Sequence, residues 1–180
     1  MSTMTQKLTF TTASVQNLVI SNPTDALYYE VLTPEWDSHQ TTVRRLDTHA
    51  DRYDTVGNIR NQSGKPVAVS MYSGGFINQD LWLRKIEGEN RKSRWEFDDG
   101  EGNYFSWAVA GSNLELRSID ERGVQSPKPI ATYYPHKRYV MVGMISQQAF
   151  LEIEPSVVDS LDTVLVSLLV LARKRRKHSL

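Results

Sequence analysis

The sequence predicts a mainly β protein, a barrel of about twelve mostly antiparallel strands that encloses one apolar C-terminal helix. From residue 7 to residue 154 the chain is a series of short segments rich in β-branched and aromatic residues. Turn residues separate these segments at intervals of about 8–12 residues. Residues 157–172 then form the one long apolar stretch. The 180 residues include no cysteine, which excludes a disulfide framework and thiol chemistry.

The predicted strands combine high β propensity with alternation of apolar and polar residues. In residues 114–119, Leu114 and Leu116 share one face while Glu115 and Arg117 share the other. One face of such a strand covers a core and the other meets water. Asn, Asp, Gly and Pro residues between the segments favour turns. The predicted strands are residues 7–11, 17–20, 26–33, 41–46, 55–60, 66–72, 80–86, 93–97, 103–110, 114–119, 130–134, 139–144 and 150–154.

Residues 157–172 are predicted to form the only long helix. Ser156 is placed to cap its N-terminus, with Asp159 three residues further along in the position of a capping box. The basic residues 173–177 follow its C-terminus, which suits the helix dipole. We therefore expect a single domain over residues 1–172 and a basic tail over residues 173–180.

The predicted helix must be buried, because 11 of its 16 residues are Val, Leu or Ala. Its polar stripe consists of Asp159, Thr163 and Ser167. Sixteen residues span about 24 Å, short of the ~30 Å hydrocarbon core, and two Asp lie within them, so no transmembrane span is expected. A partner protein is an alternative. The interior of a barrel of about twelve strands is too wide for its side chains alone to fill, so we expect the helix there.

Several segments occur in an order that is typical of a known group of proteins. They are Leu8-Thr9-Phe10, residues 27–34, Asp99-Gly100 with residues 104–107, residues 151–153, and residues 161–167 followed by the basic residues 173–176. In these segments the chain resembles the tubby-like superfamily, which includes LURP-one-related proteins and phospholipid scramblases. More narrowly it resembles a basidiomycete (fungal) family of small uncharacterised tubby-like proteins.

The resemblance implies a barrel with an internal helix. For the wider superfamily it implies phosphoinositide binding or lipid-associated roles. The chain has no phosphoinositide signature, cysteine-rich segment or calcium-binding segment to match, so the resemblance assigns no role to any one residue.

Charge is unevenly distributed along the chain. The 21 Lys and Arg balance 21 Asp and Glu, but residues 1–172 alone hold 16 basic against 21 acidic residues. The basic tail could bind an anionic membrane leaflet or act as a nuclear import signal. Lys137 and Arg138 stand beside tyrosines and could bind an anionic head group, a base or a sugar. Ordinary surface charge is the alternative for both groups. The candidate anion- and lipid-binding residues are Lys137, Arg138, Arg173, Lys174, Arg175, Arg176 and Lys177.

No motif for catalysis or metal binding occurs. Residues 47–54 contain three Asp and one His at a spacing that matches no established metal loop. Residues 98–103 lack the late Glu of a calcium loop and suit a hairpin turn. The four histidines form no ligand motif, and there is no GxSxG elbow or complete phosphate loop. We expect no catalytic residue, metal or cofactor.

The expected function is a non-enzymatic tubby-like binding or scaffold protein with affinity for anionic lipid head groups. Its expected partners are anionic membrane lipid or a protein, since a net charge of zero argues against dedicated nucleic-acid binding. The lack of cysteine and of a secretion signal favours the cytoplasm, with membrane-peripheral or nuclear placement through the tail as alternatives.

Two other functions stay open. One is a soluble cytosolic fungal carbohydrate-binding or defence protein that stacks sugars on Trp36, Trp82, Trp95 or Trp107. The other is an enzyme with an unrecognised site at an end of the barrel.

Overall fold

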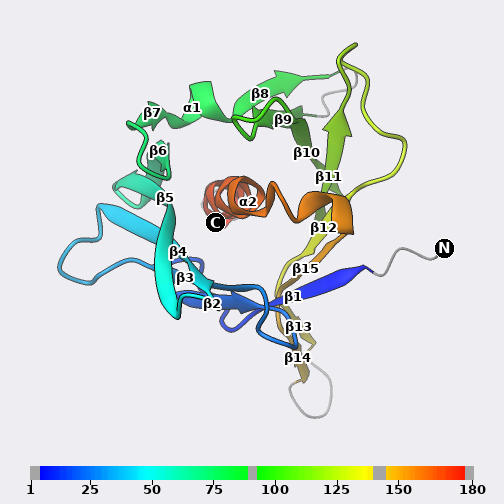
Figure 1. Ribbon diagram of the computed structural model, residues 1–180. Coiled ribbons are helices and arrows are strands. Elements are labelled where there is room, and N and C mark those ends of the chain that lie inside the picture. Colours follow the sequence, from blue (N-terminus) through cyan, green and yellow to red (C-terminus); the bar gives the residue numbers. More distant parts are fainter. Residues whose placement is uncertain (1–4, 89–92, 140–144, 177–180) are drawn as a thin grey trace.

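A computed structural model describes residues 5–88, 93–139 and 145–176 (Figure 1). In this part of the chain, one antiparallel sheet of 13 strands has the order β7-β6-β5-β4-β3-β2-β1-β15-β12-β11-β10-β9-β8. Its strands are β1 (Gln6–Phe10), β2 (Leu18–Ser21), β3 (Tyr28–Leu32), β4 (Gln40–Asp47), β5 (Arg52–Gln62), β6 (Lys65–Met71), β7 (Ile77–Asn78), β8 (Arg84–Glu87), β9 (Ser93–Asp98), β10 (Tyr104–Ala110), β11 (Asn113–Ile119), β12 (Ala131–Tyr134) and β15 (Phe150–Ile153).

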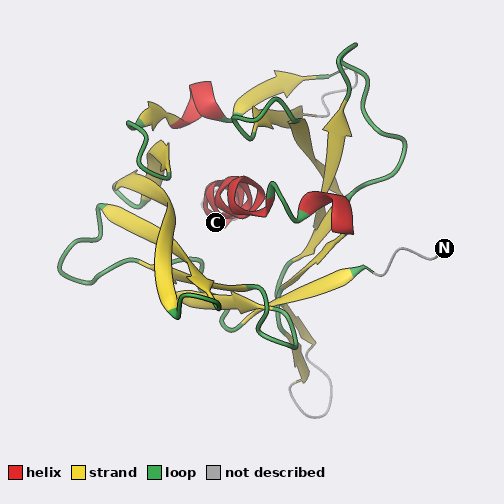
Figure 2. Cartoon of the chain, in the orientation of Figure 1, coloured by secondary structure: helices red, strands yellow, loops and turns green. Residues whose placement is uncertain are grey.

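The sheet curves around the long helix α2 (Leu161–Arg176), which is seen end-on at the centre of Figures 1 and 2. Its edge strands are β7 and β8, and the one-turn helix α1 (Gln79–Trp82) connects them. The 3₁₀ turn η2 (Pro155–Val157) leads from β15 into α2. The prediction of a mainly β fold with one long C-terminal helix is confirmed, although the strands in the described residues do not close into a hydrogen-bonded barrel.

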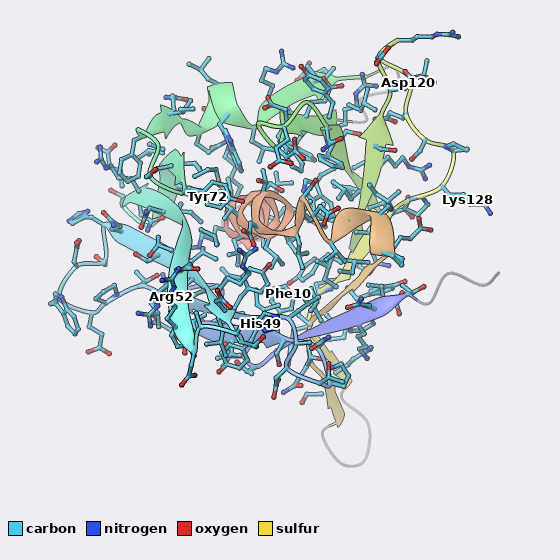
Figure 3. All side chains as sticks on the ribbon, viewed as in Figure 1. Phe10, His49, Arg52, Tyr72, Asp120 and Lys128 are labelled. Atoms are coloured by element: carbon cyan, nitrogen blue, oxygen red, sulfur yellow. The ribbon has the colours of Figure 1, made fainter. Side chains whose placement is uncertain are left out.

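The core lies between the helix and the concave face of the sheet, where side chains fill the space (Figure 3). Every residue of α2 from Leu161 to Leu171 is buried. Trp107, Leu114 and Leu116 face the helix side and have no exposed surface, as the predicted alternation requires. Because each large apolar side chain gains about 1.5–3 kcal/mol on burial, the helix and sheet stabilise one another.

The polar residues within the helix are buried, and Ser167 has hydrogen-bond partners. Ser167 accepts a hydrogen bond from Nε1 of Trp107 at 2.8 Å and donates to the carbonyl oxygen of Val164. Thr163 is 3% exposed. The predicted stripe therefore faces the protein interior. Asp159 is the exception, because it precedes the helix and is exposed.

The predicted bounds of the helix were wrong at both ends. Pro155 starts η2, so Ser156 lies inside this turn and does not cap α2. The 3₁₀ turn redirects the chain from the sheet wall into the interior, and the α-helix starts at Leu161. At the other end, residues 173–176 form the last turn of α2 and are not a separate tail.

The predicted strand 80–86 was also wrong. Residues 80–86 form most of α1 and part of β8, because Oδ1 of Asn78 accepts a hydrogen bond from the backbone N–H of Asp80 and caps a helical turn. The predicted strand 139–144 falls on a second, two-stranded sheet of β13 (Lys137–Tyr139) and β14 (Ile145–Gln147), and residues 140–144 lie outside the described part.

Gly57 of β5 allows the sheet to approach the helix. A Cβ atom at Gly57 would lie 2.8 Å from Cγ2 of Val166 in α2, which is too close for two carbon atoms. We expect Gly57→Ala to lower the free energy of unfolding by about 1–3 kcal/mol through overpacking, as measured by urea denaturation.

Gly75→Ala is the matched control, because no atom lies within 4 Å of a Cβ at Gly75. We also expect Gly57→Ala to cost less in a Val166→Ala background, since the clashing methyl group is then absent. Equal costs in the two backgrounds would contradict this close approach.

Candidate functional site

The two ends of the curved sheet can be assigned from strand direction. β15 runs from Phe150 to Ile153 and leads into α2, so the helix begins at the end of the sheet that contains Ile153. It therefore finishes at the opposite end, which contains Phe150. Because the strands are antiparallel, successive turns alternate between the two ends.

The end where α2 begins is called the acidic end. It contains the turns at residues 47–51, 98–103, 119–130 and 154–160. Arg122 and Lys128 also lie in these turns, but carboxylates predominate. They include Asp47, Asp51, Asp98, Asp99, Glu101, Asp120, Glu121, Glu154 and Asp159.

The end where α2 finishes is called the basic end. It contains the loops 11–17 and 33–39, the turn 62–65, the finish of β8, the β13–β14 sheet and the last turn of α2. Four described acidic residues lie there, namely Glu35, Asp37, Asp80 and Glu87. The described basic residues are Lys65, Lys85, Lys137, Arg138, Arg173, Lys174, Arg175 and Arg176.

At the acidic end, the buried Asp162 in the first turn of α2 is held by three groups. The hydroxyls of Tyr29 and Tyr72 donate to its oxygens at 2.7 and 3.1 Å. Nη1 of Arg45 lies 2.9 Å from Oδ2. In Figure 3 the labelled Tyr72 lies beside α2. This Asp162 cluster ties the start of the helix to strands β3 and β4 and to the residue after β6.

Burial and the neighbouring carboxylate alter the pKa values in the Asp162 cluster. Burial first, and then the charge of Asp162, raise the pKa of Tyr72 to about 12. The same two causes raise the pKa of Tyr29 further. Burial opposes the charge of Arg45, but the attraction of Asp162 raises the pKa of Arg45 overall. All four side chains have partners within the cluster, which therefore acts as a structural anchor for the start of the helix.

At the basic end, Arg173 is buried with neutral partners. Its side chain donates to the carbonyl oxygen of Val15 at 2.6 Å, to Oγ1 of Thr41 at 2.8 Å and to Oδ1 of Asn61 at 3.1 Å. No carboxylate is among its partners in the part of the chain that the structure describes. Burial lowers the pKa of Arg173 to about 10. The carbonyl end of the helix dipole offsets part of this charge, and the remainder is available to an anion.

A cavity of about 610 Å³ opens beside Arg173. Lys65 and Lys85 contribute cations from β6 and β8, and Lys174 and Arg175 contribute them from α2. Asp80 pairs with Lys174 at 2.9 Å and Glu87 pairs with Lys85 at 3.2 Å, so two of these charges are offset. The apolar part of the lining consists of Pro66, Val67, Trp95 and Leu171. We call this space the basic cavity.

Gln79 gives the basic cavity an unused polar group. The side chain is 2% exposed, and its Nε2 has no hydrogen-bond partner among the described residues. A buried amide donor without a partner costs about 1–3 kcal/mol, which an acceptor atom of a ligand would recover. The basic cavity can therefore hold an anion that also carries an apolar part.

The structure separates the predicted anion-binding residues. Arg173, Lys174 and Arg175 line the basic cavity, while Lys137 lies on the separate β13–β14 sheet, half-buried. Arg138 and Arg176 end up in β13 and α2, but their side chains lie outside the description, as does the whole of Lys177.

The sequence analysis did not predict the other residues of the basic cavity. Lys65, Lys85 and Gln79 come from segments up to 108 positions before Arg173, and only the sheet topology brings them together. Arg173 was expected to be solvated and is 7% exposed, which corrects the prediction of a free basic tail. The sequence did contain one signal for the burial of Arg173. When an apolar helical segment is buried to its last residue, the basic residue that follows it must also lie close to the interior.

The four tryptophans have different surroundings. Trp107 is fully buried, and Trp82 and Trp95 pack against the core. Trp36 is 90% exposed.

The acidic loops behave as turns. Oδ1 of Asp47 accepts hydrogen bonds from the backbone N–H groups of Ala50 and His49, and these bonds lower the pKa of Asp47. Burial raises the pKa of Asp99, but hydrogen bonds from Asn103 and Ser160 lower it overall. In the described ranges no three His, Asp or Glu side chains gather in a way that could hold a metal ion. Within the same ranges no helix is long and apolar enough to cross a membrane.

A comparison with protein families gives one match. The model of a family described as a family of unknown function (DUF6593) matches residues 13–177. No curated protein and no solved structure matches the chain.

The Asp162 cluster should contribute measurably to stability. We expect Asp162→Asn to lower the free energy of unfolding by about 2–3 kcal/mol, below the range for fully buried ion pairs because the Arg45 side chain is 45% exposed. The exposed Asp159→Asn, three residues away, should change it by about 0.5 kcal/mol or less. Similar losses for both variants in urea denaturation would contradict this role.

The tyrosines of the cluster should also make stability fall at high pH. The raised pKa of Tyr72 means that its contribution is complete below pH 10.0, the ordinary pKa, and is lost as the pH rises towards about 12. We expect a steeper loss of unfolding free energy over this window in the wild type than in Tyr72→Phe. The titration of tyrosinate absorbance should show one tyrosine fewer ionising near pH 12 in Tyr72→Phe than in the wild type. Parallel stability profiles would contradict the prediction.

Proposed function

The chain belongs to the DUF6593 family of unknown function, and we propose that it is a non-enzymatic binding protein that holds anionic lipid head groups at its basic end. The observation that carries the proposal is the basic cavity, where Lys65, Lys85 and Arg175 surround a space next to the buried Arg173. Phosphate groups are the natural partners for such a set, because Arg and Lys donate charge-assisted hydrogen bonds to phosphate oxygens.

The mixed lining supports a lipid head group over a simple inorganic anion. Trp95 and Leu171 also line the cavity and add apolar surface to it. A volume of about 610 Å³ lies in the usual range for small-molecule sites, so it accommodates a phosphorylated head group with its adjoining glycerol region. The unpaired Nε2 of Gln79 offers a donor for a hydroxyl or ester oxygen.

The separation of charge between the two ends also supports a membrane partner. An anionic leaflet attracts basic residues near its surface, at about 1 kcal/mol for each, and repels carboxylates. With the basic end toward the leaflet, the turns of the acidic end are farthest from it. This orientation is consistent with a membrane-peripheral protein.

The proposed tubby-like relationship rests on the same architecture. An antiparallel sheet that curves around one apolar C-terminal helix, α2, is the arrangement that the resemblance implies. This likeness supports a binding role and does not identify a ligand.

The experiment compares two double variants with equal loss of charge. Lys65→Gln with Lys85→Gln neutralises the basic cavity, and Arg122→Gln with Lys128→Gln neutralises two cations of the acidic end. In sedimentation with phosphatidylcholine vesicles that contain a phosphatidylinositol bisphosphate, at low salt, we expect the first variant to bind about tenfold or more weakly. We expect the second variant to bind like the wild type.

Truncation after Ala172 is not a suitable test, because it removes the buried Arg173 and its hydrogen bonds. Equal losses in the two double variants would show a general charge effect and contradict the assignment of the cavity. A wild type that fails to sediment with these vesicles would contradict lipid binding altogether.

A further inference from the structure

Trp36, in the loop between β3 and β4, is exposed to an unusual degree. It is 90% exposed, more than any other large apolar side chain in the described part of the chain. Leu81 comes next at 71%. A tryptophan ring usually contributes a large buried area to a core or an interface, so a functional role would account for its exposure.

The base of the Trp36 loop is fixed. Oγ1 of Thr33 donates to the carbonyl oxygen of Gln16 at 2.9 Å, and the backbone N–H of Asn61 donates to the carbonyl oxygen of His39 at 2.6 Å. Between these anchors the backbone N–H of Asp37 donates to the carbonyl oxygen of Pro34 and forms a turn. Trp36 therefore projects from a turn whose two sides are tied to neighbouring loops.

The same loop belongs to the basic end. Ser38 and His39 line a cavity of about 220 Å³ together with Asn61 and Arg173. Asn61 also accepts a hydrogen bond from Arg173. The exposed ring thus stands on the end of the molecule that carries the cations of the basic cavity.

We propose that Trp36 inserts into the interfacial region of an anionic bilayer when the basic end docks on it. This inference rests on the proposed function and adds a contact outside the cavity. Tryptophan prefers the membrane–water interface, where its ring meets apolar chains and its N–H stays near polar groups. The cations of the basic end attract the anionic leaflet, and the ring of Trp36 enters it. Both contributions to binding therefore act at the same end of the molecule.

Two carboxylates oppose this contact. Glu35 and Asp37 flank Trp36, and both are exposed. Near an anionic leaflet their charges weaken docking, so Glu35→Gln with Asp37→Asn should strengthen vesicle binding several-fold. This effect tests whether the Trp36 loop faces the leaflet, and the quenching experiment below tests insertion itself.

The experiment uses the full chain with vesicles of phosphatidylcholine and a phosphatidylinositol bisphosphate, with or without brominated acyl chains. Trp36→Phe identifies the emission of Trp36 by difference from the other tryptophans. We expect the Trp36 emission to shift to shorter wavelength and to be quenched by brominated lipid, and we expect Trp36→Ala to weaken binding about tenfold. Val124→Ala is the matched control, because Val124 is 59% exposed in a turn of the acidic end.

The outcomes separate this inference from the proposed function. Vesicle binding with no quenching of Trp36 would overturn insertion and leave head-group binding in place. An equal effect of Trp36→Ala and Val124→Ala would also overturn it. Failure of the wild type to bind the vesicles would overturn both proposals. Circular dichroism of each variant confirms that the exposed substitutions leave the fold intact.

Discussion

The fold depends on the burial of one helix that is apolar over most of its circumference. Leu161 to Leu171 are all buried, including the polar Asp162, Thr163 and Ser167, so the remaining chain must surround them. A flat sheet covers one face of a helix, whereas the curved 13-strand sheet reaches around α2. The small residue Gly57 follows from the same constraint, because a side chain there would collide with Val166. Sheet and helix are therefore stable only together.

Polar groups at the two ends of the helix complete this packing in different ways. At the start, Asp162 meets a cation and two hydroxyls, which satisfies its charge within the protein. At the finish, Arg173 meets only neutral oxygens and the carbonyl end of the helix among its described partners. The Asp162 cluster therefore has its charges satisfied within the protein and serves a structural role. The arrangement around Arg173 keeps a positive potential beside an open cavity, and for this reason we place the function at the basic end.

The basic end combines rigid placement with accessible chemistry. Its cations come from β6, β8 and α2, so the backbone that carries them is held by the sheet and the helix. Trp36 stands on a turn that hydrogen bonds tie to the neighbouring loops. A cavity for a head group and an exposed aromatic ring on one end form a surface that suits a membrane, whereas the opposite end carries mainly carboxylates.

Sequence by itself determined the elements. Alternation around Leu114 and Leu116 predicted a strand, because successive side chains of a strand point to opposite faces of the sheet. The apolar run predicted a buried helix. The sequence pattern misplaced the start of α2, because the 3₁₀ turn at Pro155 depends on where β15 ends in the folded sheet. Local sequence patterns could not predict the basic cavity, because Lys65, Lys85 and Gln79 are distant in sequence from Arg173 and share no motif with it. Only the tertiary structure decided that these residues meet and that Arg173 is buried without a carboxylate partner among the described residues. It also decided that acidic and basic turns separate, because antiparallel pairing sends alternate turns to opposite ends of the sheet.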